Sequence, residues 1–202
     1  MTAKIFVHEV SRASLVNGPG TRAVVWVQGC SIGCPGCFNP ETHAAHSDSD
    51  GGSDPEELGK SLGHLAVDGL TVSGGEPLEQ PEAVAALIEA FRKVNPGTVL
   101  IFSGLSPKRI FASPEARQTI LLTDAVLAGP YVEGDRSSGI WSGKQLILVT
   151  DRIYPEELTP EKRLEVSLQS SGQLRLSGYP GLMERELFSK LMKVGFQDDD
   201  KG

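Results

Sequence analysis

The amino-acid sequence predicts an α/β fold, built around a parallel sheet, for most of this 202-residue chain. Short apolar segments of strand length alternate with amphipathic segments of helix length between residues 22 and 150. Such alternation is typical of parallel strands that are joined by right-handed helical crossovers. A closed barrel of eight units usually needs about 250 residues, and this chain has roughly five units, so we predict a partial, open (β/α) barrel.

The predicted strands are short apolar runs. The first of them is continuously apolar and ends at Gly29, which is the pattern of a buried strand. The runs that we predict as strands of the sheet cover residues 22–29, 69–73, 98–103, 124–129 and 144–150. Asp68 and Asp124 adjoin the starts of two of these strands and are expected to be solvated.

Three helices are predicted between these strands. An aspartate followed by a proline opens the first helix, residues 54–65. Apolar residues spaced by three and four positions predict the second, residues 80–94. The third, residues 107–122, is expected to break or kink near Pro114, because proline removes a helical hydrogen bond.

The last 50 or so residues carry a different pattern. Residues 163–178 alternate between apolar and polar around a Ser-Gly pair, which predicts a hairpin, and residues 182–195 have the pattern of an amphipathic helix. The acidic residues 197–202 are expected to fray. We therefore divide the chain into a core, residues 1–150, and a C-terminal hairpin-plus-helix extension that packs on it, residues 151–202.

Composition limits the classes of partner. A net charge of −7 disfavours nucleic acid, whose phosphates are bound by clustered lysine and arginine. No apolar run approaches the roughly 20 residues of a membrane helix, and the first residues lack the apolar core of a secretory signal. We expect a cytoplasmic protein with neither a nucleic-acid nor a membrane partner.

All three cysteines of the chain lie in one C-x3-C-x2-C motif, formed by Cys30, Cys34 and Cys37. Clustered cysteines in a reducing compartment are more often metal-binding or catalytic than cross-linked. The motif follows the first predicted strand, and the sequence SGGE, residues 73–76, follows the second. Because chemistry in parallel α/β folds sits at the carboxyl ends of the strands, both segments are expected at one edge of the sheet.

Two kinds of metal site are compatible with three thiolates, which are soft ligands. One is a structural zinc site with His43 as a fourth ligand, although the usual second cysteine or histidine pair is missing from the sequence. The other is a [4Fe-4S] cluster with three protein ligands and one open iron. The loop composition favours the cluster, because small or constrained residues within and directly before the motif let the backbone wrap closely around a bulky group. These small or constrained residues are Gly29, Gly33, Pro35 and Gly36.

The cysteine motif together with SGGE resembles the radical S-adenosylmethionine (radical SAM) enzymes. More narrowly, the segments VNGPGTR, CPGCFNPETH, SGGEPL and IFSG are similar to the activating enzymes of anaerobic (class III) ribonucleotide reductases. Gly36, directly before the third cysteine, matches that branch. The resemblance covers about residues 15–148. It weakens at IWSGKQLIL, residues 140–148, where the branch carries an Arg-Gly-Ser-Ser-Asn-Gln run.

The resemblance implies a barrel of the radical SAM type and a role for each residue that matches the family's motifs. Cys30, Cys34 and Cys37 would hold one [4Fe-4S] cluster per chain, and its open iron would chelate S-adenosylmethionine. An electron would then cleave this cofactor to methionine and a 5′-deoxyadenosyl radical, with flavodoxin or a ferredoxin as the low-potential donor. The further cofactor contacts expected from the resemblance are Ser73, Gly74, Gly75, Glu76, Asn39, Ser103, Gly104 and Arg22.

Three functions follow from these observations. The leading one is an activating enzyme that leaves a glycyl radical on a partner enzyme such as an anaerobic ribonucleotide reductase. The second keeps the cofactor chemistry but modifies a peptide or a small metabolite, which the altered residues 140–148 and the extra C-terminal segment favour. The third is a non-catalytic module that binds zinc or an iron–sulfur cluster.

Overall fold

The computed structural model describes residues 3–47, 51–132, 143–158, 164–168 and 174–178. Contacts within the chain divide it into two compact units, Met1–Pro160 and Glu161–Gly202. The predicted division at residue 150 stays a prediction, as does the packing of an extension on the core. No helix within the described ranges is long and apolar enough to cross a membrane.

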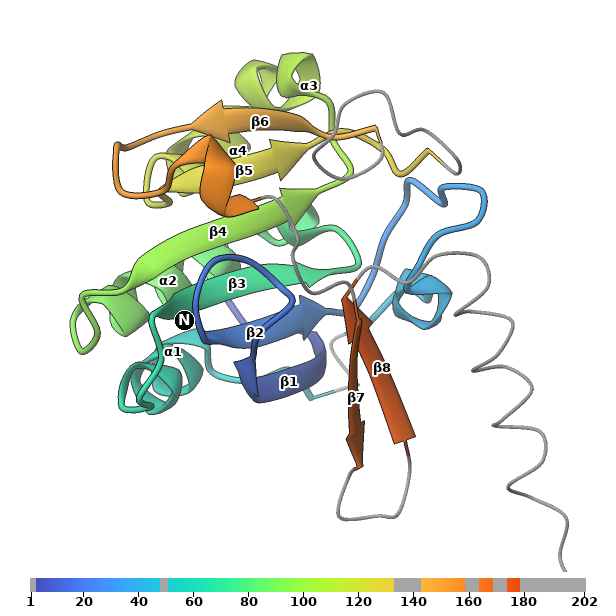
Figure 1. The fold of residues 1–202 in the computed structure, drawn as a ribbon. Helices are drawn as coiled ribbons and strands as arrows, with labels where there is room; N and C mark the ends of the chain where they lie inside the picture. Colours follow the sequence, from blue (N-terminus) through green and yellow to red (C-terminus); the bar gives the residue numbers. More distant parts are fainter. Residues whose placement is uncertain (1–2, 48–50, 133–142, 159–163, 169–173, 179–202) are drawn as a thin grey trace, which may run out of the picture. The chain divides into compact units, whose positions relative to one another are not determined.

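The first unit is built on one sheet of six strands in the order β1-β2-β3-β4-β5-β6 (Figure 1). The four central strands are mutually parallel, and the two outer strands run antiparallel to their neighbours. The strands are β1 (Val7–Ser14), β2 (Arg22–Val27), β3 (Gly69–Gly74), β4 (Thr98–Ser103), β5 (Ala125–Ala128) and β6 (Gln145–Leu148). The result is a mixed α/β fold with a largely parallel sheet, as predicted, while closure into a partial barrel stays a prediction.

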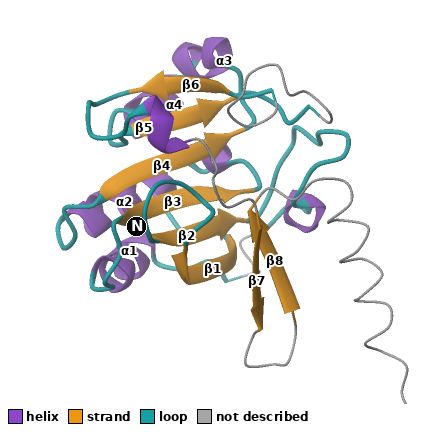
Figure 2. Ribbon diagram, viewed as in Figure 1, coloured by secondary structure: helices purple, strands orange, loops and turns teal. Residues whose placement is uncertain are grey.

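The helices of this unit follow the strands along the chain. They are α1 (Pro55–Gly63), α2 (Pro81–Arg92), α3 (Pro107–Ala112) and α4 (Pro114–Ile120), with 3₁₀ turns η1 (Pro40–His43), η3 (Pro77–Glu79) and η4 (Pro155–Leu158). Figure 2 shows α1, α2 and α4 on the same side of the sheet, behind it in that view. The core lies between these helices and the strands, and α2 buries Val84, Leu87, Ile88 and Phe91 in it.

Local sequence explains where the helices begin and end. The Asp54 side chain accepts hydrogen bonds from the amides of Glu56 and Glu57 and so caps α1. Ser113 ends α3 and caps α4, and it has an extended backbone because Pro114 follows it. The predicted break in the helix of residues 107–122 is thereby confirmed.

Two features of the sheet differ from the sequence-based expectation. β1 was not predicted, because its sequence VHEVSRAS mixes charged with apolar residues and its pairing with β2 is interrupted by irregularities. The predicted strand at residues 144–150 is present as β6, but it runs antiparallel to β5. The local sequence of β6 carries no information about its direction, which is fixed by its pairing with β5.

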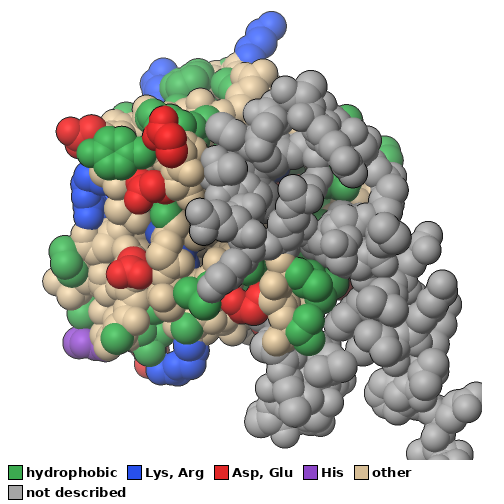
Figure 3. Space-filling view, viewed as in Figure 1, with side chains coloured by type: hydrophobic (Ala, Val, Ile, Leu, Met, Phe, Trp, Pro, Cys, Tyr) green, Lys and Arg blue, Asp and Glu red, His purple; other side chains and the backbone are tan. Residues whose placement is uncertain are grey.

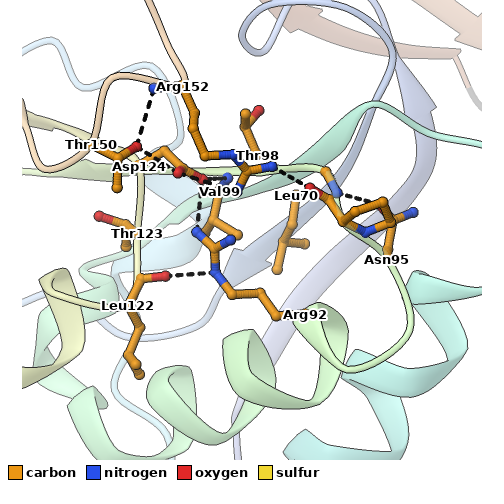
Figure 4. A network of polar contacts seen from close by, with 12 residues as sticks. Leu70, Arg92, Asn95, Thr98, Val99, Leu122, Thr123, Asp124, Thr150 and Arg152 are labelled. Atoms are coloured by element: carbon orange, nitrogen blue, oxygen red, sulfur yellow. Dashed lines mark hydrogen bonds and ion pairs between the residues drawn. The ribbon is translucent and has the colours of Figure 1, made fainter.

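A polar network fixes the amino-terminal end of β5 (Figure 4). Asp124, which has a fully buried side chain, accepts hydrogen bonds from the Val99 amide and the Thr150 hydroxyl, each at 2.7 Å. It also pairs with Arg92 at 2.7 Å and with Arg152 at 3.4 Å. Burial raises the pKa of Asp124, but these hydrogen bonds and the Arg92 charge outweigh burial and leave the pKa below its usual value. The expectation of a solvated Asp124 is therefore wrong.

The second unit contains an antiparallel pair of strands, β7 (Leu164–Leu168) and β8 (Leu174–Gly178), which agrees with the predicted hairpin. The predicted helix at residues 182–195 and the acidic end of the chain lie outside the described residues. On the face that Figure 3 shows, lysine and arginine side chains of the described part stand apart from one another.

Candidate functional site

The three cysteines lie on the loop that follows β2, at the carboxyl edge of the parallel strands. Cys30, Cys34 and Cys37 are all half-buried, and all three are free thiols. The Cys37 amide donates a hydrogen bond to the Cys34 carbonyl at 3.1 Å, which closes a tight turn. Gly36 (φ +66°) has the left-handed conformation that the third residue of such a turn favours, and Gly33 (φ +59°), just before the turn, is left-handed as well.

The three cysteine side chains lie close enough for their negative charges, as thiolates, to favour binding of a metal ion or an iron–sulfur cluster. Burial raises the pKa of the Cys37 thiol, a hydrogen bond from the Asn39 amide lowers it, and the charges of Cys34 and Cys30 raise it again. Thiolates at these positions therefore repel one another unless a metal group neutralises them. Cysteine thiolates are the usual ligands of iron–sulfur clusters, so the three cysteines fit a [4Fe-4S] cluster that keeps one iron without a protein ligand.

The alternative zinc site is not assembled in the structure. Within the residues that the structure describes, no group of three or more histidine, cysteine, aspartate or glutamate side chains, the three cysteines included, is placed to hold one metal ion. A [4Fe-4S] cluster does not require such a group, because each thiolate binds a different iron. His43 lies half-buried on η1. His46 instead stacks on Phe6, with 3.8 Å between the ring centroids and 13° between the planes.

The SGGE segment packs directly against the start of the cysteine loop. The Gly75 amide donates to the Val27 carbonyl and the Glu76 amide donates to the Gly29 carbonyl, each at 2.8 Å. A Cβ on Gly75 would lie 2.1 Å from the Gly29 oxygen, and a Cβ on Gly74 would lie 2.6 Å from the Val27 nitrogen. Only glycine permits this approach, which brings the two sequence motifs together at one edge of the sheet, as predicted.

Glu76 is fully buried and binds three donors of the protein. One carboxylate oxygen, Oε1, accepts from the Leu78 amide at 3.0 Å and from the Ser103 hydroxyl at 2.8 Å. The other, Oε2, accepts from the Gly104 amide at 2.6 Å. Burial raises the pKa of Glu76, while these hydrogen bonds and the charge of Lys144 oppose the rise. Glu76 and Ser103, which the resemblance suggests as cofactor contacts, thus bind each other.

Lys144 belongs to the same site, although the sequence did not single it out. Its ammonium donates to the carbonyls of Ser103 at 2.8 Å and Gly129 at 2.6 Å, at the ends of β4 and β5. Burial lowers the pKa of Lys144, and the nearby negative charge of Glu76 and of the three cysteines raises it. The signal that could have found Lys144 is its place in residues 140–148, where the resemblance breaks down.

Glu79 is a second residue that sequence reasoning missed. Its carboxylate accepts the Ser31 amide at 3.2 Å and 3.1 Å and the Ser31 hydroxyl at 2.5 Å. Ser31 directly follows the first cysteine, so Glu79 holds the beginning of the loop. Its position three residues after Glu76, in the turn that follows SGGE, was the available signal.

Arg22 lies at the opposite end of β2 from the cysteines. All five N–H groups of its buried guanidinium have partners within the protein: Nε donates to Thr71 Oγ1, Nη2 to the Leu70 and Thr98 carbonyls, and Nη1 to the Pro19 carbonyl and Thr98 Oγ1. Burial lowers the pKa of Arg22 to about 10. Arg22 does not fit the predicted cofactor contact for two reasons. It lies at the edge of the sheet opposite the cysteines, and none of its N–H groups is left to bind a ligand.

The remaining predicted contacts lie near the cysteine loop. Asn39 precedes η1, its carbonyl accepts the Thr42 amide at 3.1 Å, and its own amide faces the Cys37 thiol. Ser73 is half-buried near the end of β3, opposite Trp26 in the register with β2. Their roles toward a cofactor stay predictions.

Comparison with known proteins gives independent information on this site. The family described as "4Fe-4S single cluster domain" matches residues 16–148. The anaerobic ribonucleoside-triphosphate reductase-activating protein of Escherichia coli (strain K12) is 28% identical over 143 residues, which cover 67% of this chain and 92% of that protein. The pyruvate formate-lyase-activating enzyme of Clostridium pasteurianum is 34% identical over 106 residues, 48% of this chain and 43% of that enzyme. The crystal structure of QueE from Escherichia coli aligns with a TM-score of 0.41 at 18% identity, covering 50% of this chain and 53% of that one.

Proposed function

Given that this chain belongs to the 4Fe-4S single cluster domain family and is an enzyme of the radical SAM type, we propose that it activates a partner enzyme by generating a glycyl radical on it. The observation that carries the proposal is the contact between the cysteine loop and the SGGE segment, made by the Gly75 and Glu76 amides. This contact holds a cluster-binding loop beside a cofactor-binding segment at the carboxyl edge of the sheet.

The chain's own residues would prepare this site for the cofactor. Bound at Cys30, Cys34 and Cys37, a single [4Fe-4S] cluster would supply the electron that cleaves S-adenosylmethionine to methionine and a 5′-deoxyadenosyl radical. Gly74 and Gly75, without side chains, let the SGGE backbone lie against Val27 and Gly29, so the segment expected to bind the methionine end of that cofactor stays beside the cysteine loop. Buried Glu76 holds the turn after SGGE and the end of β4 in place.

Two observations support an enzyme as the target. Both relatives are named as activating proteins, one of a reductase and the other of a lyase. In addition, the sheet of six described strands, in which the outer strands β1 and β6 run antiparallel to their neighbours, suits an open (β/α) barrel. The mouth of an open barrel would admit a segment of another protein. A reducing cytoplasm with flavodoxin or a ferredoxin as the electron donor suits the three free thiols.

The proposal is tested by incubating the reconstituted, reduced protein with S-adenosylmethionine and a panel of candidate glycyl-radical enzymes. We expect a glycyl-radical EPR signal on one candidate together with 5′-deoxyadenosine, and neither product from a Cys34→Ser variant. If 5′-deoxyadenosine forms but every candidate stays free of radical, the activation of an enzyme is contradicted.

A second candidate function has a specific observation in its favour. Residues 140–148 depart from the activating-enzyme pattern, and Lys144 in that segment reaches the site. A peptide or small-metabolite substrate would then replace the partner enzyme. The result of 5′-deoxyadenosine without a partner radical would favour this function. The third alternative, a non-catalytic module, disagrees with relatives that are named as activating enzymes.

A further inference from the structure

We infer that Lys144 is a positioning residue of the cysteine site, whose ammonium joins the carboxyl ends of β4 and β5 and places a positive charge beside the cluster-binding loop. The inference rests on the proposed function, since it concerns the reduction potential of a cluster at Cys30, Cys34 and Cys37. Nothing in the sequence motifs assigns a role to this lysine.

The first step is the bridge between strands. Lys144 Nζ donates to the Ser103 carbonyl at 2.8 Å and to the Gly129 carbonyl at 2.6 Å. Ser103 is the last residue of β4, and Gly129 directly follows β5. The Gly129 amide donates to the same Ser103 carbonyl at 3.1 Å. The Lys144 ammonium thus joins the ends of β4 and β5. Its hydrogen bonds are charge-assisted, and such bonds are stronger than those between neutral groups.

The second step leads from this bridge to the cysteine loop. The Gly104 amide, directly after Ser103, donates a hydrogen bond to Glu76 Oε2 at 2.6 Å. Gly104 also lies against Ile32, because a Cβ on Gly104 would be 2.6 Å from the Ile32 Cδ1 atom. Ile32 stands between the first and second cysteines, so any shift of the β4 end that Lys144 holds is passed to the loop.

The third step concerns charge. Glu76 is a fully buried carboxylate, and thiolate ligands add further negative charge nearby. The pKa of Lys144 is lowered by burial and raised by Glu76 and by each of the three cysteines, so these charges attract the ammonium. A fixed positive charge favours the reduced form of a cluster, which carries one more electron. Removing that charge should therefore move the reduction potential to a more negative value.

The test uses the full chain, reconstituted anaerobically with iron and sulfide. Lys144→Met removes the charge and keeps most of the side-chain length, while Lys144→Arg keeps both charge and donors. Lys60→Met is the matched control, because Lys60 is an exposed lysine on α1 that pairs only with Glu56, at 3.5 Å, among the described ion pairs. The midpoint potential is measured by redox titration followed by EPR, and thermal unfolding checks that each variant is folded.

We expect the Lys144→Met potential to be more negative than that of the unsubstituted protein, and the Lys144→Arg and Lys60→Met potentials to be close to it. If Lys144→Met does not fold, Lys144→Gln, which keeps a donor without the charge, provides the same comparison. A neutral variant with an unchanged potential would overturn the inference, and so would a Lys144→Arg potential that follows the neutral variants. Failure of the unsubstituted chain to bind a cluster would instead overturn the proposed function.

Discussion

Glu76 illustrates at the scale of one residue how a motif position can act within the protein. The resemblance to radical SAM enzymes suggested a contact between this carboxylate and the cofactor. In the structure the carboxylate is buried and accepts from Leu78, Ser103 and Gly104, so it joins the turn after SGGE to the end of β4. A carboxylate suits this place because both of its oxygens are acceptors.

Replacing Glu76 by glutamine should test that role. The glutamine side chain has an NH₂ group in place of one carboxylate oxygen. At least one of the donors that now bind Glu76 would then face this NH₂ group instead of an acceptor. We expect Glu76→Gln to lower the free energy of unfolding by about 1–3 kcal/mol, measured by urea denaturation at neutral pH. Glu89→Gln, on the exposed side of α2, should change it by less than about 0.5 kcal/mol. Equal effects of the two substitutions would contradict the account of Glu76.

Arg22 provides the opposite case, a residue predicted near the cofactor that serves the fold. Arg22→Met would leave the buried carbonyl of Leu70 and the partly buried carbonyls of Pro19 and Thr98 without this donor. Each such acceptor costs about 1–3 kcal/mol, so we expect a loss of stability of at least about 3 kcal/mol in urea denaturation.

The same variant separates a structural role from a role at the site. Because Arg22 lies at the far edge of the sheet from the cysteines, the molecules that remain folded should bind as much iron per chain as the unsubstituted protein. A folded Arg22→Met protein that binds no iron would show that the residue acts at the cluster after all.

At the scale of elements, Asp124 joins the start of β5 to α2, β4 and the segment after β6. Its pKa is lower in the folded protein than its ordinary value near 3.9. A carboxylate with a depressed pKa contributes stability that is present above its unfolded-state pKa and is lost as the pH falls through its folded-state pKa.

We therefore expect the stability of the protein to fall below about pH 4 and the Asp124→Asn variant to show a shallower fall. At neutral pH this variant should be less stable by about 1.5–3 kcal/mol, because it loses hydrogen bonds to a charged group. Urea denaturation at a series of pH values measures both effects. Asp151→Asn, at an exposed neighbouring position, is the control, and a curve for Asp124→Asn that coincides with it would contradict the prediction.

The contact between β3 and the cysteine loop can be tested through Gly75. An added methyl group at Gly75 would meet the Gly29 backbone, which cannot move aside as a flexible side chain can. We expect Gly75→Ala to cost about 1–3 kcal/mol of stability and to reduce the iron and sulfide bound per chain after anaerobic reconstitution.

The control for Gly75 is a glycine with open space around it. Gly51 has a left-handed backbone (φ +81°) and no atom within 4 Å of an added Cβ, and asparagine tolerates this conformation. Gly51→Asn should bind iron like the unsubstituted protein. Full iron binding by Gly75→Ala would mean that the close approach of SGGE to the loop is not needed for the cluster.

At the scale of the whole molecule, features set by local sequence could be predicted. The apolar spacing of α2 and the proline at residue 114 depend on neighbouring residues, and the structure agrees with both. The meeting of the cysteine loop with SGGE followed from a rule for parallel strands, which places both at one edge.

Features that depend on distant partners could not be predicted. Arg22 binds Thr98, which is 76 residues away, and Lys144 binds Ser103, which is 41 residues away. No local pattern marks Arg22 as buried or Lys144 as partly buried, since both residue types are usually exposed. The mixed sequence of β1 and the antiparallel direction of β6 are likewise decided by pairing across the sheet.

The central claim is that this chain holds a [4Fe-4S] cluster with an open iron that takes S-adenosylmethionine. The most direct test is EPR of the anaerobically reconstituted, dithionite-reduced protein with and without S-adenosylmethionine. The account predicts a reduced [4Fe-4S] signal that changes when the cofactor is added, followed by 5′-deoxyadenosine. Zinc bound in place of iron, or a cluster signal indifferent to S-adenosylmethionine, would contradict it.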